Sequence, residues 1–129
     1  MIVGKAIYNI LSNTTAITDI VGTKIYPEIA PQNVSQPYIV YSVVSNSPVD
    51  TKEEGGEIDE AAVEVYCFNT KYTLAIDLGV EVRKALDRKT GAYGGVKIQT
   101  ISYTSEQMDV NPERSIWVAI QDYTIKVIN

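Results

Sequence analysis

The spacing of hydrophobic residues alternates along this chain between a helical and a strand period, and this alternation restricts the fold more than any other feature. Residues 2–12 and 71–89 place apolar side chains three and four positions apart, as an amphipathic helix requires. The segments between and after them alternate with period two, as half-buried strands do. The chain therefore predicts helices that pack on a sheet.

Local signals mark where the helices end. Thr14 or Thr15 is expected to cap a short second helical segment, which Gly22 ends. The segment 71–89 is expected to be the longest helix, with acidic residues early, basic residues late and Gly91 as its stop.

Runs of β-branched and aromatic residues predict four strands. They cover residues 38–45, 58–68, 96–105 and 115–128. The first two are expected to form a hairpin, and 108–114 a polar connection. The alternation of the last strand slips near Gln121, where a bulge would keep Tyr123, Ile125 and Val127 facing inward.

The order of elements is helix, extended loop, strand, strand, helix, strand, strand. Hairpin-joined strands with few helices predict an α+β fold, with an antiparallel (mixed) sheet and two main helices packed on one face. A length of 129 residues suits a single domain. We therefore expect one domain over residues 1–129.

The acidic residues are concentrated in one segment. The net charge is −5, and residues 50–64 alone carry seven acidic side chains against Lys52, a local charge of −6. We expect a mobile hairpin tip around Gly55 and Gly56. Its acidic residues are Asp50, Glu53, Glu54, Glu57, Asp59 and Glu60. This sign of charge disfavours a free-standing nucleic-acid-binding module.

Neither a catalytic nor a metal-binding grouping is predicted, and no cofactor. The chain lacks histidine, and its single cysteine, Cys67, is expected to be a buried thiol. Aligned as a calcium loop from Asp50, the chain has Lys52 at the third position and Ala61 at the twelfth, where carboxylates are needed. The glycine-rich run 91–95 follows a helix, whereas a phosphate loop precedes one. We expect a protein that is not an enzyme.

The proline-containing segment 25–37 is the candidate assembly interface. Three prolines exclude a helix there and stiffen an extended loop. Tyrosine, of which the chain has nine, is enriched at protein interfaces. The residues proposed for the interface are Ile25, Tyr26, Pro27, Pro31, Pro37 and Tyr38.

The same segment carries a resemblance to a family. Ile25-Tyr26-Pro27, Ala30-Pro31-Gln32 and Gln36-Pro37-Tyr38 follow a short N-terminal helix and lead into the first strand. This front half resembles the tail-completion, or tail-terminator, proteins of long-tailed phages and prophages. The later alternating strand, helix and closing strand agree with that family in order.

The resemblance implies a structural virion protein. Such proteins form a ring, typically six-fold, that caps the head-proximal end of the tail tube, ends tube polymerisation and joins tail to head. The implied partners are further copies of the chain, the tail tube protein and the head connector or stopper. DNA would pass through without specific binding, and no membrane is involved. Assembly would take place in the bacterial cytoplasm.

Other functions stay open at this stage. Another neck ring, either a head–tail stopper or an adaptor, is the nearest alternative. A small metal-dependent hydrolase that uses the acidic segment is a distant one. The acidic tip would either meet a neighbouring protein or line the DNA passage.

Overall fold

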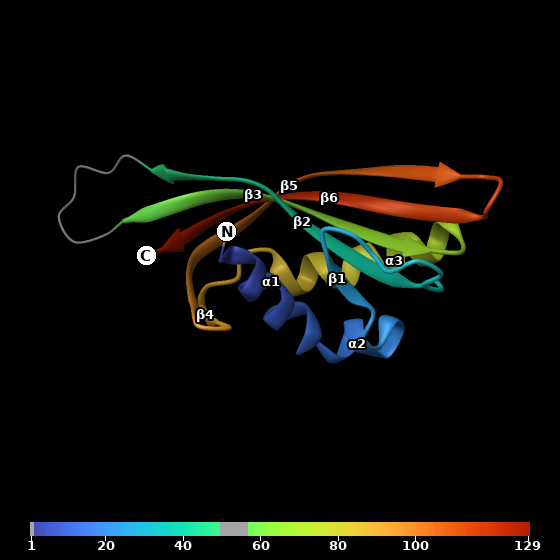
Figure 1. The fold of residues 1–129 in the computed structure, drawn as a ribbon, viewed down its shortest axis with the longest axis horizontal. Coiled ribbons are helices and arrows are strands. Elements are labelled where there is room, and N and C mark those ends of the chain that lie inside the picture. The colour runs from blue at the N-terminus through green and yellow to red at the C-terminus, as the bar shows by residue number, and fades with distance from the viewer. Residues whose placement is uncertain (1, 50–56) are drawn as a thin grey trace.

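The computed structural model describes residues 2–49 and 57–129, which form one six-stranded sheet with helices on one of its faces (Figure 1). The helices are α1 (Val3–Ser12), α2 (Thr15–Val21) and α3 (Tyr72–Leu86). The strands are β1 (Ile25–Pro27), β2 (Tyr38–Val49), β3 (Ile58–Asn69), β4 (Gly91–Tyr93), β5 (Val96–Asn111) and β6 (Ile116–Ile128). The predicted α+β class is confirmed.

The strand order across the sheet is β1-β2-β3-β6-β5-β4. β1 pairs parallel with β2, and the other neighbours pair antiparallel. β1 is an addition to the prediction, which had residues 25–27 in an extended loop. The three residues pair with 39–41, and the Ile25 side chain enters the core.

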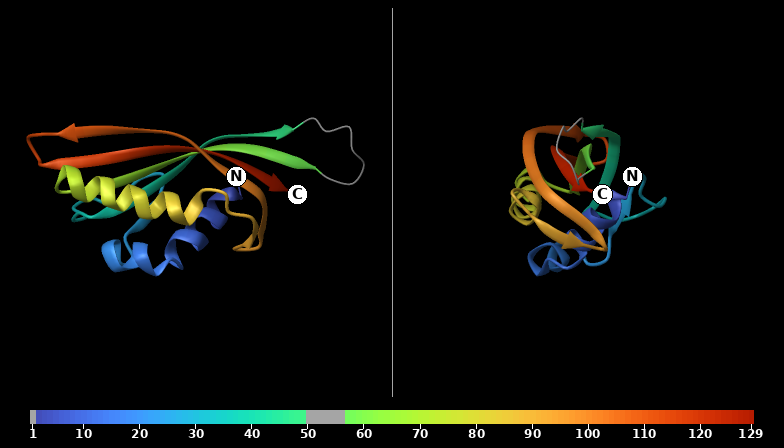
Figure 2. Two further views of the ribbon diagram at one scale, coloured as in Figure 1. Left: turned by 180° about the vertical axis from the view of Figure 1, so that it is seen from behind. Right: turned by 90° about the vertical axis from the view of Figure 1, so that its left-hand side faces the viewer.

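α1 and α3 lie over one face of the sheet (Figure 2), and alternate side chains of β3 and β6 beneath them form the centre of the core. On β3 these are Ala61, Val63, Val65 and Cys67, and on β6 they are Ala119, Gln121, Tyr123, Ile125 and Val127. α3 contributes Leu78, Val82 and Leu86, each fully buried. The opposite face of the sheet carries no helix within the described residues. No described helix is long and apolar enough to cross a membrane.

α3 ends at Leu86, earlier than the sequence predicted. Asp87 has an extended backbone, and its carboxylate accepts a hydrogen bond from the Tyr103 N–H at 3.1 Å. The next residue, Arg88, donates its N–H to the Ile101 carbonyl at 2.8 Å. These contacts with β5 take the chain out of the helix, so Gly91 begins β4 instead of ending α3.

The bulge predicted near Gln121 in β6 is wrong. β6 pairs with β3 without a break, and the register shifts lie in β5, between Ile98 and Thr100 and between Tyr103 and Ser105. Gln121 interrupts the hydrophobic pattern because it is a buried polar residue in the inward series. β5 also continues to Asn111, so most of the predicted 108–114 connection is strand.

Candidate assembly surface

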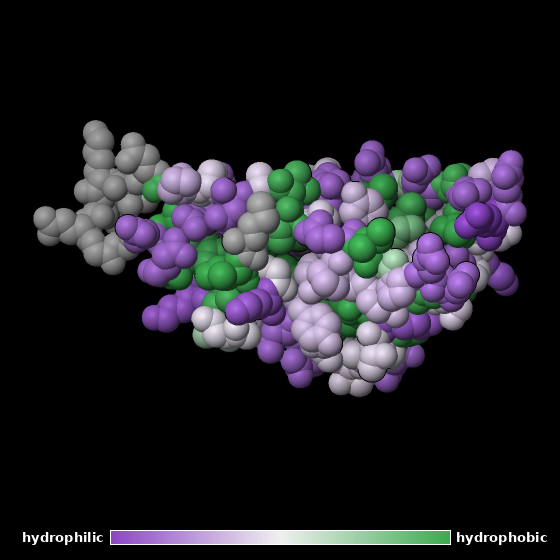
Figure 3. All heavy atoms as spheres, in the orientation of Figure 1, coloured by the Kyte–Doolittle hydropathy of each residue, from purple (hydrophilic) through white to green (hydrophobic). Residues whose placement is uncertain are grey.

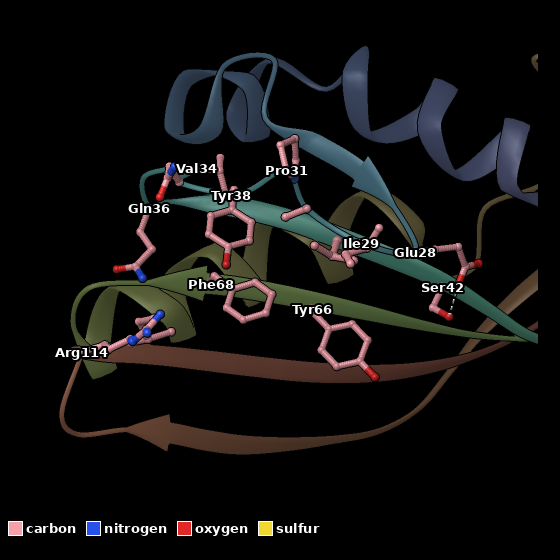
Figure 4. Close-up of a pocket in the computed structure, with 14 residues that line it drawn as sticks. Glu28, Ile29, Pro31, Val34, Gln36, Tyr38, Ser42, Tyr66, Phe68 and Arg114 are labelled. Atoms are coloured by element: carbon pink, nitrogen blue, oxygen red, sulfur yellow. Dashed lines mark hydrogen bonds between the residues drawn. The ribbon is translucent and has the colours of Figure 1, made fainter.

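A groove of about 520 Å³ lies on the helix-free face of the sheet, between residues 28–37 and the outward side chains of β2 and β3 (Figure 4). Its floor is formed by Tyr38, Tyr66 and Phe68. Its walls include Ile29, Pro31 and Val34, and Arg114 and Ile116 lie at the start of β6. We call this feature the aromatic groove.

Strand pairing assembles the aromatic floor. Tyr38 and Phe68 are register partners on β2 and β3, so their side chains project from the same face. Their rings stack at 4.5 Å between centroids, and Tyr66, two residues before Phe68, continues the row at 6.3 Å. Burial raises the pKa of the Tyr38 and Tyr66 hydroxyls. The floor therefore presents neutral aromatic surface over a wide pH range.

Glu28 holds the wall of the groove in place. Its N–H donates to the Tyr41 carbonyl at 2.8 Å, and its carboxylate accepts the Ser42 hydroxyl at 2.7 Å and the Val43 N–H at 3.1 Å. The side chain thus substitutes for the next residue of β1 along the edge of β2. Its φ of 63° turns the chain over the outer face. Segment 28–37 consequently covers Val40, which is only 7% exposed although it points away from the helices.

The proposed interface residues divide between the groove and the core. Pro31 and Tyr38 line the groove, and the Tyr26 ring lies 6.4 Å from the Tyr38 ring. Pro27 is exposed and lines a second hollow beside α1, while Pro37 is half-buried and follows a cis peptide bond.

Ile25 differs from the other interface candidates because it belongs to the hydrophobic core, with 4% exposure. In this fold its side chain does not reach the surface.

The acidic residues lie at the other end of β3 from the aromatic groove. Glu57 directly precedes β3, and Asp59 accepts a hydrogen bond from Asn46 Nδ2 at 3.2 Å. Glu60 is exposed opposite Lys126 in the register. Asp50, Glu53 and Glu54 lie outside the described residues. The predicted β2–β3 hairpin is confirmed and extends to the pair of Val49 and Ile58.

Sequence reasoning missed most of the groove. Tyr38 was selected from its own segment, but Phe68, Ile29 and Arg114 were not connected with it. The available signal was the end of β3, where apolar residues occupy both faces of the strand. A strand whose outward positions change from charged to aromatic predicts a surface that another element or partner covers.

Apolar side chains also reach the surface beyond the groove floor. Ile29 is 80% exposed, and Figure 3 shows hydrophobic patches between hydrophilic ones over β2 and the segment that follows β1. Leu74 and Val80 on α3 are exposed by 42% and 44%. These exposed apolar side chains offer contact surfaces for macromolecules.

Across residues 2–49 and 57–129, no three acidic or cysteine side chains are grouped so as to hold a metal ion.

Comparison with known proteins gives one family match and a structural likeness. A family model described as "Tail completion protein gp17" matches residues 5–128. A chain in the solved structure titled "Virion of native gene transfer agent (GTA) particle" has the same fold, with a TM-score of 0.70 and 14% sequence identity. The alignment covers 96% of this chain and 92% of that one. No curated protein matches.

Proposed function

Because the chain belongs to the tail completion protein gp17 family and is thus a structural protein of a phage tail, we propose that it caps the tail tube at its head-proximal end. In this role it ends tube polymerisation and allows the tail to join the head. The family match over residues 5–128 is the observation that carries the proposal.

The cap is a ring of several copies of the chain, six in the simplest case. One side of the ring contacts the tail tube protein and the other contacts the head connector or stopper. The exposed apolar surface supports this assembly, since large exposed apolar patches mark interaction sites. The aromatic groove supplies one such surface, and the gene transfer agent likeness supports it through a chain of this fold within an assembled particle.

DNA passes through the ring without specific binding. The acidic end of the β2–β3 hairpin supports this, because carboxylates repel phosphates and deny DNA the counterion release that drives its binding. Facing the lumen, the acids form a negative collar. Facing outward, they dock to basic residues of a neighbouring protein.

Electron microscopy of particles from a phage that lacks this gene tests the proposal. We expect overlong tails, with or without heads, and restoration of normal particles when the gene is supplied in trans. Tails of normal length that fail to join heads would instead indicate a head–tail stopper or adaptor. Normal tails joined to heads would exclude a role at this junction.

A further inference from the structure

We propose that neighbouring copies of the chain join through the exposed face of α3 in one copy and the helix-free face of the sheet in the next. This inference rests on the ring assembly proposed above and specifies its subunit joint. The two faces lie on opposite sides of the sheet (Figure 2), so the contact is head-to-tail, the kind that closes into rings.

The open edges of the sheet are poor alternatives for this joint. On β2, the Glu28 carboxylate accepts a hydrogen bond from the Val43 N–H. On β5, the Asp87 carboxylate accepts a hydrogen bond from the Tyr103 N–H, and the Asp109 carboxylate accepts one from the Val110 N–H. Carboxylates at an edge strand oppose pairing with another chain. Side-chain faces are therefore the surfaces left for the joint.

Hydrogen bonds between α3 and the strands show which residues of the helix lie beside which residues of the sheet. We call the position of a residue along the direction of β3 its height. At the start of the helix, Asn69 Nδ2 donates to the Leu74 carbonyl at 3.4 Å. Leu74, which is 42% exposed, therefore lies at the height of Phe68 on the other face. Both positions are apolar.

The next height has an apolar residue on α3 and the border of the aromatic floor on the outer face. Gln121 Nε2 donates to the Gly79 carbonyl at 2.7 Å, and Gln121 is the register partner of Val65. Val80, which is 44% exposed, follows Gly79, and the outward residues on either side of Val65 are Tyr66 and Glu64. Leu74 thus shares its height with the floor of the aromatic groove, and Val80 lies where this floor borders on Glu64.

Further along, the faces carry charges. The Arg83 guanidinium lies 3.8 Å from the centroid of the Tyr103 ring, and Tyr103 is in register with Tyr123 and, through it, with Val63. Glu64 is the next residue on the outer face. The end of α3 therefore has the height of Glu64.

Glu64 and Asp122 are direct register partners, so two like charges face each other across β3 and β6. Such pairs are destabilising in a sheet. Among the described residues, no basic side chain forms an ion pair with either carboxylate, and Asp122 accepts only the Ser105 hydroxyl as a side-chain hydrogen bond. Lys84, which follows Arg83 and has 70% of its side chain exposed, carries the charge that this pair needs from a neighbouring copy.

A second charged height follows. The Arg88 N–H donates to the Ile101 carbonyl, and Ile101 is in register with Ile125 and, through it, with Ala61. The exposed Glu60 precedes Ala61 on the outer face. Arg88 thus lies at the height of Glu60.

The remaining charges on the two faces leave the end of α3 positive and the outer face of the sheet negative. From residue 83 to residue 89 the chain has four basic side chains against Asp87, which already bonds to β5. Glu81 lies 3.5 Å from Lys84, and Lys126 stands beside Glu60. The outer face keeps a negative excess at these heights, and the α3 end keeps a positive one.

Cyclic symmetry turns equal height into contact. When copies are related by rotation about an axis that runs roughly along α3 and β3, each residue meets residues of the same height. Leu74 then meets Phe68, Val80 meets the border of the groove floor, and the basic end of α3 meets the acidic residues Glu60, Glu64 and Asp122. Charge complementarity of this kind fixes the orientation and register of an interface.

Cysteine cross-linking in assembled particles tests the joint. The variant with both Glu64→Cys and Lys84→Cys, treated with a short bismaleimide, is expected to give a ladder of multimers beyond the dimer. Each single variant is expected to stay monomeric. The native thiol is a silent background because Cys67 is fully buried. No ladder from the double variant, or dimers from one single variant, would overturn the proposal.

Charge reversal gives an independent readout. Glu64→Lys and Lys84→Glu are each expected to lower the yield of joined particles roughly tenfold, because like charges meet at every joint, and combining them restores the yield. Lys5→Glu, at an exposed position of α1, is the matched control with unchanged yield. Failure of the combined variant to recover, with wild-type thermal stability, would overturn the proposed pairing. Normal joined tails without the gene would instead overturn the proposed function.

Discussion

Gln121 Nε2 donates a 2.7 Å hydrogen bond to the carbonyl oxygen of Gly79, which lies 42 residues earlier in the chain. The same nitrogen donates to Glu106 Oε1 at 3.0 Å, and the Gln121 carbonyl accepts the Tyr123 hydroxyl. A Cβ at Gly79 would lie 3.1 Å from the Gln121 nitrogen, so glycine permits this approach of α3 to β6. One buried amide thus ties the longest helix to the central strands.

Replacing Gln121 with leucine is expected to destabilise the protein by about 1–3 kcal/mol, because the buried Tyr123 hydroxyl loses its acceptor. Urea unfolding of Gln121→Leu, Tyr123→Phe and the double variant measures the loss. The double variant should cost less than the sum of the two singles. Gln107→Leu, at an exposed position on β5, is the control. Additive effects would contradict a shared network.

The buried face of α3 should dominate its contribution to stability. Leu78→Ala and Leu86→Ala are each expected to cost roughly 2–5 kcal/mol in the free energy of unfolding, since both side chains are fully buried. Leu74→Ala, at a 42% exposed position of the same helix, should change it by less than about 1 kcal/mol. Similar losses at all three positions would show that the exposure pattern of α3 is wrong.

Tyr38→Ala and Tyr26→Ala are expected to impair tail assembly more than folding. Tyr38 is half-buried and stacks on Phe68, an interaction worth about 0.5–1.5 kcal/mol, so the variant should fold while the groove loses part of its floor. Joined particles and thermal unfolding are measured side by side. Tyr8→Ala, at a 46% exposed position outside the groove, is the control. Activity that falls only in proportion to stability would assign both tyrosines to the core.

Cys67 should make stability fall at alkaline pH. Burial raises the pKa of its thiol above the ordinary value of 9.0, so the folded state keeps a proton that the unfolded state releases. The contribution is therefore complete below about pH 9 and is lost as the pH rises above that value. Thermal unfolding from pH 8 to pH 10 measures it. Cys67→Ala should show a shallower decline, and an identical slope would contradict the assignment.

The acidic hairpin can be tested apart from the subunit joint. Changing Glu53, Glu54 and Glu57 to glutamine leaves Glu60 available for the contact with the neighbouring copy. Tail joining and DNA ejection are then measured separately. We expect slowed ejection with normal joining, as a lumenal collar predicts. Failed joining would indicate a docking arm, and no change in either assay would exclude both roles.

Much of the fold could be predicted because helix and strand periods are local properties of the sequence. α1 was expected within a residue of its bounds, and Tyr123, Ile125 and Val127 face inward as expected, although β6 needs no bulge to place them there. The hairpin of β2 and β3 followed from the glycine pair between two strand-like runs. In each case one face is buried, so hydrophobic spacing specifies the side that packs.

The candidate site was only partly predictable. Tyr38 and Pro31, two of the residues predicted for the assembly interface, line the groove, and they were selected because prolines and tyrosines in an extended loop are a local signal. Phe68 and Arg114 lie 30 and 76 positions after Tyr38, and only strand pairing brings them to the same face. Ile25 was chosen by its neighbours in the sequence, but its pairing with Ile39 places it in the core.

The sequence by itself determined the α+β class, the order of the long elements and the inward face of each of them, because these depend on residues within one or two turns of each other. Tertiary structure alone decided that α3 stops where Asp87 reaches Tyr103, that Glu28 folds a loop over the outer face, and that Gln121 is buried in an intact strand. Each of these depends on a hydrogen bond between residues at least 15 positions apart, whose distance is set only when the sheet closes.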